Sequence, residues 1–312
     1  GDQMMKPYLM TAALALAGAA PAALAQAETD GTTQAVRTDL WVGSDADGNE
    51  ARKLALGWDV DHRDIEHWWG VKVEHARFSG RGWRDDQDRV FVSGAGDAGE
   101  RWRWDGDVGT NGDDLIGRAS IHSLDAYRKE FFIERDVLET RNGVAQGWVQ
   151  TFAGAGIDVP MGERWSASGV AGLQDFGVGD NLRTHLRGNV VFAVAPEQGL
   201  SLQLRTRYYR NSEPREADYY SPRWYGEALG VVGWRRHVGG YQYTARAGLG
   251  RQRSAGDTSK RARMLEVGVE TPRWKDTWLR LDAGYTDTPV LTDTGTDSYS
   301  YRYLRLQAFV AF

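Results

Sequence analysis

The stretch that decides the fold is Tyr301-Arg302-Tyr303-Leu304-Arg305-Leu306-Gln307-Ala308-Phe309-Val310-Ala311-Phe312. Apolar residues occupy every second position: Leu304, Leu306, Ala308, Val310 and Phe312. The other register is mostly polar, with Tyr303, Arg305 and Gln307. Because successive side chains of a strand point to opposite faces, this pattern predicts a strand with one apolar face. The apolar register continues to the last residue, whereas terminal strands of soluble proteins usually trail into polar residues. The edge strand of a soluble sandwich remains an alternative.

We interpret this stretch as the closing strand of a transmembrane β-barrel. It resembles the C-terminal signature of Gram-negative outer-membrane proteins. That resemblance implies that Leu304, Leu306, Ala308, Val310 and Phe312 form the assembly signal, read by the barrel-assembly machinery. We expect these five side chains to face membrane lipid, and Tyr303, Arg305 and Gln307 to face the lumen. The predicted neighbours of this strand are residues 276–286 and the first strand, 36–43.

The start of the chain has the pattern of a secretory signal peptide. Lys6 precedes an apolar run, 9–24, and Ala23-Leu24-Ala25 supplies a cleavage site of small residues. We therefore expect residues 1–25 to be a signal peptide, with Gly1-Asp2-Gln3 as extra residues before the first Met. A transmembrane anchor is the alternative, but the run is short and contains Pro21. The remaining predicted parts are a short periplasmic lead, 26–35, and the barrel, 36–312.

The composition excludes several classes of protein. The chain has no Cys, which excludes a disulfide scaffold and any thiolate metal site. A net charge of -5 argues against nucleic acid as a partner. The mean hydropathy is -0.54, and no second long apolar run follows the first. Since lumen-facing rows of a barrel are polar, low hydropathy is compatible with a barrel in the outer membrane.

Alternating segments fill the chain after the signal. We count about sixteen, each of roughly ten residues, which is the length of a barrel strand. They run near 36–43, 51–63, 66–78, 87–95, 99–108, 114–124, 128–138, 147–158, 163–173, 181–194, 199–210, 224–235, 239–250, 260–270, 276–286 and 300–312. An all-β antiparallel barrel with both termini in the periplasm is the predicted fold.

The connections between these segments are expected to alternate between short and long. Short ones include Asp64-Ile65, Gly96-Asp97-Ala98, Pro160-Met161-Gly162, Pro196-Glu197-Gln198 and His237-Val238. Long ones are Ser44–Glu50, Ser79–Asp86, Glu139–Gln146, Gln174–Asp180, Asn211–Arg223, Arg251–Ser259 and Asp287–Tyr299. Tight periplasmic turns and longer external loops are typical of outer-membrane barrels. No long connection shows an obvious acidic or basic constriction motif.

Tryptophans gather near the ends of the predicted strands. This placement predicts aromatic girdles at both membrane interfaces, where an amphipathic ring lies at headgroup depth. Packing in a sandwich core is the alternative. The residues concerned are Trp68, Trp69, Trp102, Trp104, Trp148, Trp165, Trp224, Trp234, Trp274 and Trp278.

The polar rows supply candidates for the lumen lining. Basic candidates are Lys72, Arg101, Arg103, Arg118, Arg183, Arg187, Arg205, Arg207, Arg246, Arg280 and Arg305. Acidic candidates are Asp105, Asp107, Glu130, Glu134, Glu266 and Asp282, with Asp59, Asp61, Glu74 and Asp136 as further members. Cross-strand ion pairs that only rigidify the barrel are one interpretation. The other is a hydrophilic conduit whose basic side lies near 183–207 and whose acidic side lies near 105–136.

Aromatic residues near the longest loops are candidate sugar contacts, because aromatic faces stack on sugar rings. They are Tyr219, Tyr220, Trp224 and Tyr225, for which a girdle is the alternative. The stretch 217–225, Ala-Asp-Tyr-Tyr-Ser-Pro-Arg-Trp-Tyr, resembles a segment in the barrel domains of exopolysaccharide-export porins of cellulose and poly-N-acetylglucosamine secretion. This resemblance implies a sixteen-stranded export pore with polysaccharide as cargo.

The chain departs from those exporters because only about ten residues, rather than a helical-repeat scaffold, separate the signal peptide from the first predicted strand. A separate periplasmic scaffold protein is therefore an expected partner, and a stand-alone barrel, a fragment or a relative with another cargo all stay open. A general diffusion porin and a plugged structural or adhesion barrel are the alternative functions.

Neither an enzyme nor a metal or cofactor site is expected. Ser120, His122 and Ser123 lie on one predicted strand, but no acid can be assigned to orient the histidine. The segment 45–50 lacks the distal Glu of a calcium loop. We interpret it as an acidic external loop that contacts lipopolysaccharide through divalent cations, with outer-membrane lipid around the barrel.

Overall fold

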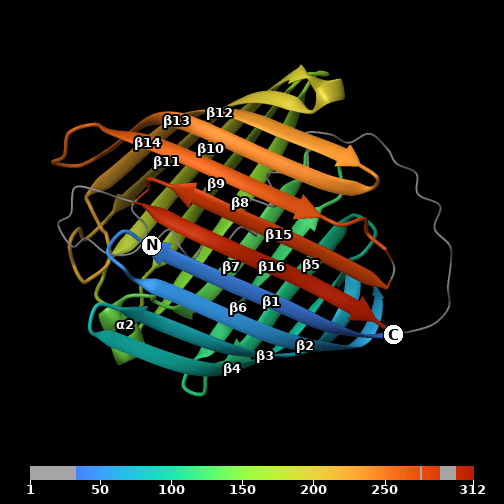
Figure 1. The fold of residues 1–312 in the computed structure, drawn as a ribbon. Coiled ribbons are helices and arrows are strands. Elements are labelled where there is room, and N and C mark those ends of the chain that lie inside the picture. Colours follow the sequence, from blue (N-terminus) through green and yellow to red (C-terminus); the bar gives the residue numbers. More distant parts are fainter. Residues whose placement is uncertain (1–32, 275, 289–299) are drawn as a thin grey trace.

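The computed structural model describes residues 33–274, 276–288 and 300–312, so the predicted signal peptide lies outside the described residues. Strands dominate the described chain (Figure 1). They are β1 (Thr33–Asp45), β2 (Glu50–Asp64), β3 (His67–Gly80), β4 (Trp83–Asp97), β5 (Trp102–Thr110), β6 (Leu115–Ser123), β7 (Lys129–Val137), β8 (Val149–Met161), β9 (Trp165–Asp175), β10 (Leu182–Ala195), β11 (Leu200–Asn211), β12 (Trp224–Val238), β13 (Tyr241–Ser254), β14 (Lys260–Glu270), β15 (Thr277–Thr286) and β16 (Tyr301–Ala311).

Within residues 33–274, 276–288 and 300–312, two short helices interrupt the strands, α2 (Arg141–Gln146) and the 3-10 turn η1 (Pro196–Gln198). No helix in the described ranges is long and apolar enough to cross a membrane. Because β1 begins at Thr33, the last residues of the predicted lead belong to the first strand.

Each strand pairs antiparallel with its neighbours in sequence, and β1 pairs with β16, so the sheet closes into a barrel. The closing register sets Ala35 opposite Ala311 and Leu40 opposite Leu306. At its end, the Phe312 N–H donates to the Gln34 carbonyl at 2.8 Å, and the Gln34 N–H donates to the Phe312 carbonyl at 3.2 Å. The predicted sixteen-strand antiparallel barrel is confirmed, including both neighbours of the last strand. Closure removes the open edges that hydrocarbon does not tolerate.

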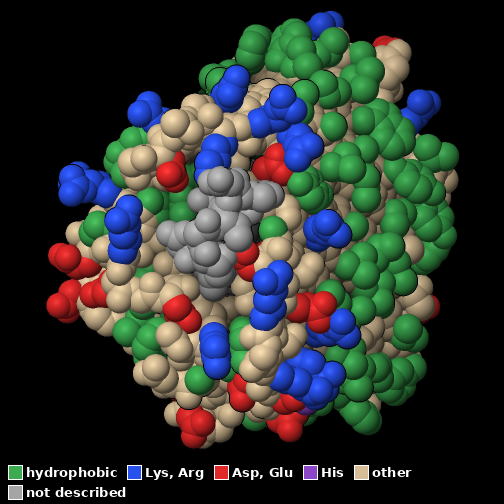
Figure 2. Space-filling model, turned by 60° about the vertical axis from the view of Figure 1, so that its left-hand side comes forward, with side chains coloured by type: hydrophobic (Ala, Val, Ile, Leu, Met, Phe, Trp, Pro, Cys, Tyr) green, Lys and Arg blue, Asp and Glu red, His purple; other side chains and the backbone are tan. Residues whose placement is uncertain are grey.

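The two faces of the wall have opposite chemistry, as β2 illustrates. Leu54 and Leu56 are 49% and 54% exposed on the outer face. Lys53 and Asp59, on the other face, are 2% and 1% exposed. A soluble protein has the reverse distribution, since its charged residues are almost never fully buried. Figure 2 shows the consequence: hydrophobic side chains cover the outer wall on its right-hand side, while charged side chains crowd the end that faces the viewer.

The connections lie at two ends of the barrel, on the left and right of Figure 1. We call one the turn end, with connections 65–66, 98–101, 124–128, 162–164, 196–199, 239–240 and 271–276. We call the other the loop end, with connections 46–49, 81–82, 111–114, 138–148, 176–181, 212–223 and 255–259. Residues 287–288, after β15, also lie there. Longer connections do occur at the loop end, but only from β7 onward, so the regular alternation expected along the whole chain is wrong for its first third.

The predicted long loop Ser79–Asp86 is the clearest correction. Only residues 81–82 connect β3 and β4, and Gly82 has φ 75°, a conformation that favours glycine. The paired strands continue as a polar ladder, in which the Arg77 guanidinium lies 2.6 Å from an Asp86 oxygen. A strand that extends beyond the apolar band has charges on both faces, so its pattern is indistinguishable from that of a loop.

The expectation of two tryptophan girdles is also corrected. Every exposed tryptophan of the described chain lies near the turn end: Trp58, Trp69, Trp104, Trp165, Trp234 and Trp274. Other members of the predicted girdles face inward. The Arg37 guanidinium lies 3.7 Å from the centre of the Trp68 ring, and Trp278 stacks on Phe309. Trp148 packs against buried residues of the loop end. Among the described residues, the exposed tryptophans therefore gather at one end of the barrel rather than at both.

Candidate functional site

The inner wall holds the predicted lumen residues, with one exception. The residues that lie on strands, as predicted, are Lys72, Arg103, Arg118, Arg183, Arg187, Arg205, Arg207, Arg246, Arg280, Arg305, Asp105, Asp107, Glu130, Glu134, Glu266 and Asp282. Arg101 is the exception, since it is exposed in the connection 98–101 at the turn end. The sequence pattern predicted a strand over 99–108, whereas β5 begins at Trp102. Arg101 was therefore placed on a strand although it precedes one.

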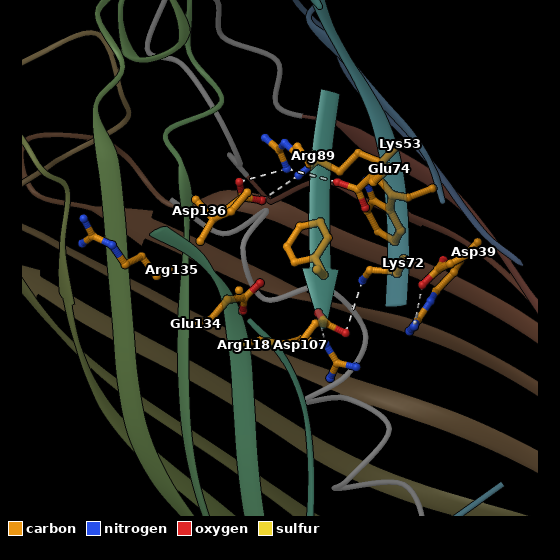
Figure 3. A pocket seen from close by; sticks show the side chains of 15 residues that line it. Asp39, Lys53, Lys72, Glu74, Arg89, Asp107, Arg118, Glu134, Arg135 and Asp136 are labelled. Carbon is orange, nitrogen blue, oxygen red and sulfur yellow. Dashed lines mark hydrogen bonds and ion pairs between the residues drawn. The ribbon is translucent and has the colours of Figure 1, made fainter. Parts of the chain in front are cut away.

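Four charged side chains, Lys53, Glu74, Arg89 and Asp136, lie together in the interior near the loop end (Figure 3). Glu139 joins them through Lys53. Lys53 Nζ on β2 lies 2.8 Å from Asp136 Oδ2 on β7 and 2.5 Å from Glu139 Oε1. Arg89 on β4 lies 3.0 Å from Asp136 Oδ1 and 3.1 Å from Glu74 Oε1. We call Lys53, Glu74, Arg89, Asp136 and Glu139 the transverse ion network. Since a buried charge requires a partner, this network links the wall of β2–β4 to that of β7 and narrows the lumen.

A second group of ion pairs lies deeper in the same half of the barrel. Lys72 Nζ lies 3.2 Å from Asp107 Oδ1, and Arg118 bridges Asp107 at 3.4 Å and Asp105 at 3.0 Å. Figure 3 shows Lys72, Asp107 and Arg118 around the pocket that Glu74, Arg89 and Asp136 of the transverse ion network also line. The structure thus brings together residues from the predicted basic and acidic sets, and their charges largely compensate.

Other predicted lumen residues pair within one wall. Glu130 accepts from Arg128 at 2.7 Å, and Arg280 pairs with Asp282 at 2.7 Å. Arg103 pairs with Glu66 of the turn end at 2.6 Å. These contacts are short-range in the barrel and do not cross the lumen.

The connection 138–148 folds into the barrel, which its sequence did not reveal. Its helix α2 begins after Thr140, whose side chain accepts from the Gly143 N–H at 3.0 Å. The helix ends at Gly147, whose φ of 66° is the left-handed conformation that glycine adopts readily. Val144 of α2 packs with Ala51 and Phe78 of strands β2 and β3. The loop therefore reaches the opposite wall and narrows the entrance above the transverse ion network.

A carboxylate from another connection holds this inward loop. Asp218 accepts from the Thr140 hydroxyl at 2.7 Å and from the Asn142 N–H at 2.9 Å. The second bond satisfies one of the free N–H groups at the start of α2, where the backbone favours negative charge. Asp218 thus joins the connection 212–223 to the connection 138–148.

A third connection is joined in the same way. Glu216 accepts from the backbone N–H groups of Asp180 and Asn181, at 2.7 and 3.0 Å. Leu138, Phe176 and Tyr219, one from each connection, form a common apolar cluster. We call the three connections, 138–148, 176–181 and 212–223, the loop cap.

Tyr219 is the central side chain of the loop cap. Its ring stacks on Phe176 with centroids 4.0 Å apart, and its hydroxyl accepts from the Asn181 amide at 2.8 Å. Burial raises the pKa of Tyr219 to about 12, because the ionised phenolate would lose its hydration there.

The predicted sugar-contact aromatics are mostly inaccessible. Tyr219, Tyr220 and Tyr225 are 2%, 4% and 1% exposed. Tyr225 stacks on Tyr209 with centroids 4.9 Å apart, so its face is occupied by another ring. Trp224 is half-buried at the start of β12. This placement corrects the expectation of open stacking faces, because packing within the loop end uses them.

Lys53, Arg89 and Glu139 are the main residues that the candidate set lacked. Lys53 belongs to the same alternating row as Asp59, which is the one signal that could have included it. Glu139 lies outside any strand, and its contact with Lys53 depends on how the loop folds. Such long-range pairs have no local signature.

The structure shows no assembled catalytic or metal centre within the described residues. The Ser120 hydroxyl donates to Asp105 at 2.6 Å, and Ser123 accepts from the Lys129 N–H at 2.9 Å, so neither hydroxyl contacts His122. No cluster of three or more potential metal ligands occurs in the described ranges. In the acidic segment 45–50, Asp45 accepts from the N–H groups of Asp47 and Asn49, which makes it a turn-forming residue.

Comparison with known proteins identifies solved structures with a similar fold. No protein-family model and no curated protein sequence matches the chain. Among solved structures, it is similar to one described as a bacterial polysaccharide outer membrane secretin, with a TM-score of 0.64 and 12% identity over 90% of this chain and 99% of that chain. Pseudomonas aeruginosa OccK5 gives a TM-score of 0.42 and 9% identity over 90% of this chain and 98% of that chain. The first similarity shows a shared barrel fold.

Proposed function

We propose that the chain forms a channel in the outer membrane of a Gram-negative bacterium and passes an exported polysaccharide. The observation that carries this proposal is the closed barrel with an apolar outer face and a charged inner face. Closure satisfies the backbone in hydrocarbon, and a polar interior offers a hydrated path. The turn end then faces the periplasm and the loop end faces outward, because short turns are typical of the periplasmic side.

Two observations support a polymer rather than small solutes. The barrel shares its fold with a structure described as a bacterial polysaccharide outer membrane secretin. In addition, three connections of the loop end are tied together in the loop cap, and the transverse ion network crosses the interior below them, an arrangement suited to a gated channel. An export channel that is closed at rest keeps small solutes out and opens for its cargo. The barrel-assembly machinery, lipopolysaccharide and a periplasmic scaffold protein remain predicted partners.

A barrel that does not transport is the second candidate function. The transverse ion network favours it, because Lys53 and its two carboxylate partners bridge the interior in a buried, compensated arrangement. In that case the charged inner face would only stabilise the wall.

A deletion strain tests the export proposal. We expect deletion to abolish secretion of a surface polysaccharide while the cells keep an intact outer membrane, and a plasmid copy to restore it. Normal secretion without the chain would contradict export. Normal secretion together with reduced uptake of small hydrophilic solutes would instead support a diffusion porin.

A further inference from the structure

The outer face of β13 and β14 changes character at the loop end. Nearer the turn end its exposed residues are apolar, as Leu249 and Leu265 illustrate. At the loop end the same outward rows continue with four exposed arginines, Arg251 and Arg253 on β13 and Arg261 and Arg263 on β14. We call these four residues the outer arginine cluster. Residues two apart on a strand are about 7 Å apart, so the cluster begins directly beyond the apolar band. Figure 2 shows basic side chains where the apolar wall meets the loop end.

Two arginines of the cluster lie directly opposite each other. The register of β13 and β14 pairs Arg251 with Arg261. Like charges in directly opposed positions destabilise a sheet. Neither guanidinium has a hydrogen bond or an ion pair in the part of the chain that the structure describes. The stability of the wall therefore does not account for this pair.

A second opposed pair of arginines at the loop end differs in its partners. Arg52 of β2 lies opposite Arg77 of β3, also on the outer face. Each of them has its own carboxylate, because Arg52 pairs with Glu50, and Arg77 lies 2.6 Å from an Asp86 oxygen. The protein thus neutralises the opposed arginines of β2 and β3, whereas those of β13 and β14 have no carboxylate partner among the described residues.

Two acidic residues of the described chain contact the outer arginine cluster. Asp287, after β15, accepts from Arg263 at 2.7 Å. Asp257 offers only its backbone carbonyl, which accepts from Arg253 at 3.3 Å, while its carboxylate accepts from the Ser254 hydroxyl at 2.7 Å. Four guanidinium groups thus meet two acidic residues, so the cluster carries an excess of positive charge.

An apolar groove of about 550 Å³ lies on the same face and reaches the cluster at Arg263. Val232, Leu249 and Leu265 line it, together with Gly230 of β12. A Cβ added to Gly230 would meet only the Leu249 carbonyl oxygen, at 3.9 Å. Packing within the protein therefore does not require this glycine, although glycine inside a strand costs stability. The missing side chain leaves room on the lipid-facing wall.

We infer that the outer arginine cluster and the groove together bind lipid A, the phosphorylated glycolipid that anchors lipopolysaccharide in the outer leaflet. The inference gives this predicted partner a site, and it rests on the proposed placement of the loop end at the outer leaflet. Guanidinium groups bind phosphate oxygens in a bidentate fork, and basic clusters at the membrane surface recognise anionic head groups. A phosphate held by Arg251 and Arg261 offsets their repulsion, and the groove beneath them receives an acyl chain.

Lipid binding to the refolded full chain in detergent micelles tests this inference. The probes are lipid A with two phosphates, phosphatidylglycerol and phosphatidylcholine, and native mass spectrometry measures their affinities. We expect lipid A to bind at least about tenfold more tightly than either phospholipid. Equal affinity for phosphatidylglycerol would overturn the assignment to lipid A. Equal affinity for phosphatidylcholine would overturn recognition of the head group altogether.

A pair of double variants tests the arginines. R251Q/R261Q removes the opposed pair of β13 and β14, and R52Q/R77Q removes the opposed pair of β2 and β3 as a matched control. We expect the affinity for lipid A to fall at least about tenfold in R251Q/R261Q and to stay unchanged in the control. Without lipid, R251Q/R261Q should be as stable as the original chain or more stable, because the repulsion is gone. Equal affinities in the two variants, with folding verified by heat-modifiable mobility, would refute the role of the cluster.

A second pair of variants tests the groove. Gly230→Leu fills it, and we expect several-fold weaker binding of lipid A. Gly169→Leu is the control, since Gly169 lies on β9, and an added Cβ there would meet only the Arg187 carbonyl oxygen, at 3.8 Å. Unchanged binding in Gly230→Leu would show that no acyl chain occupies the groove.

Failure of this site and failure of the channel can be told apart. Single-channel current does not require lipid A, so a conducting barrel that lacks the lipid preference would overturn the inference alone. A folded barrel that binds lipid A as expected but passes no current would support the site and contradict the channel.

Discussion

Lys53 on β2 and Asp136 on β7 form an ion pair of 2.8 Å, although five steps around the barrel separate their strands. Glu139 of the inward loop joins the same lysine at 2.5 Å. One buried cation therefore connects two walls and a loop. The loop end therefore depends on Lys53 for contacts between β2, β7 and the inward loop.

Replacing Lys53 tests this dependence. Lys53→Met should lower the free energy of unfolding by about 3–5 kcal/mol, because it removes the cation of the buried Glu139 carboxylate and leaves Asp136 with Arg89 alone. Urea unfolding in detergent micelles measures the change. Arg52→Met is the control, since Arg52 is the next residue, points outward and is largely exposed. It should cost less than about 1 kcal/mol. Equal effects of the two variants would show that the network does not stabilise the barrel.

Asp218 should control the position of the inward loop. Asp218→Ala removes the acceptor for the Thr140 hydroxyl and the Asn142 N–H, so α2 should separate from the loop cap. We expect trypsin to cleave after Arg141 at least about tenfold faster than in the original chain, corresponding to two lost charge-assisted bonds.

Asp180→Ala serves as the control for that experiment. Asp180 is exposed on the neighbouring connection, and it contributes its backbone N–H rather than its carboxylate to the loop cap. Cleavage after Arg141 should therefore stay slow in Asp180→Ala. Protection of Arg141 in Asp218→Ala as well would mean that packing alone holds the loop.

The loop cap should weaken at alkaline pH because of Tyr219. Its pKa rises from 10.0 to about 12 on burial. Below pH 10 the phenol is protonated whether the cap is closed or released, so the cap keeps its full stability. Between pH 10 and about 12 the released tyrosine ionises first, and stability falls as the pH rises. We expect the open probability in bilayer recordings to increase across this range.

Tyr219→Phe isolates the contribution of that one phenol. The variant keeps the ring that stacks on Phe176 but has no ionisable group. Its open probability should change much less between pH 9 and pH 11, a range chosen to bracket the ordinary tyrosine pKa of about 10. The same alkaline response in both proteins would assign the opening to another group.

The outer contact between Trp58 and Phe312 should help the closing strand to assemble. The two rings meet edge to face with centroids 6.4 Å apart, on the exposed face near the turn end. Phe312→Ala should reduce the yield of heat-modifiable barrel and cost about 0.5–1.5 kcal/mol for the ring pair. Leu202→Ala, which shortens an exposed apolar side chain on the outer face of β11, should assemble nearly normally. Equal yields in the two variants would argue against a role for this aromatic residue.

The barrel itself could be predicted from the sequence because its rule is local. Leu304, Val310 and Phe312 are exposed on the outer face and Arg305 is buried inside, as the period of two requires. Closure followed from the same pattern, since a strand that is apolar on its outer face needs partners on both edges in lipid.

The interior could not be predicted in the same way. The contacts of Lys53 with Asp136 and Glu139 join residues more than eighty positions apart and depend on an inward loop. The burial of Tyr225 depends on Tyr209 from the next strand. Alternation states which face a side chain occupies, but not whether a neighbour covers it.

Single-channel recording of the purified, refolded chain tests the central claim most directly. If the barrel is a channel, each insertion into a planar bilayer should add a steady step of current, and Lys53→Met should widen or stabilise the open level. Heat-modifiable mobility must first show that the protein is folded. Folded barrels that insert without any current, in the original chain and in Lys53→Met alike, would contradict a transport function.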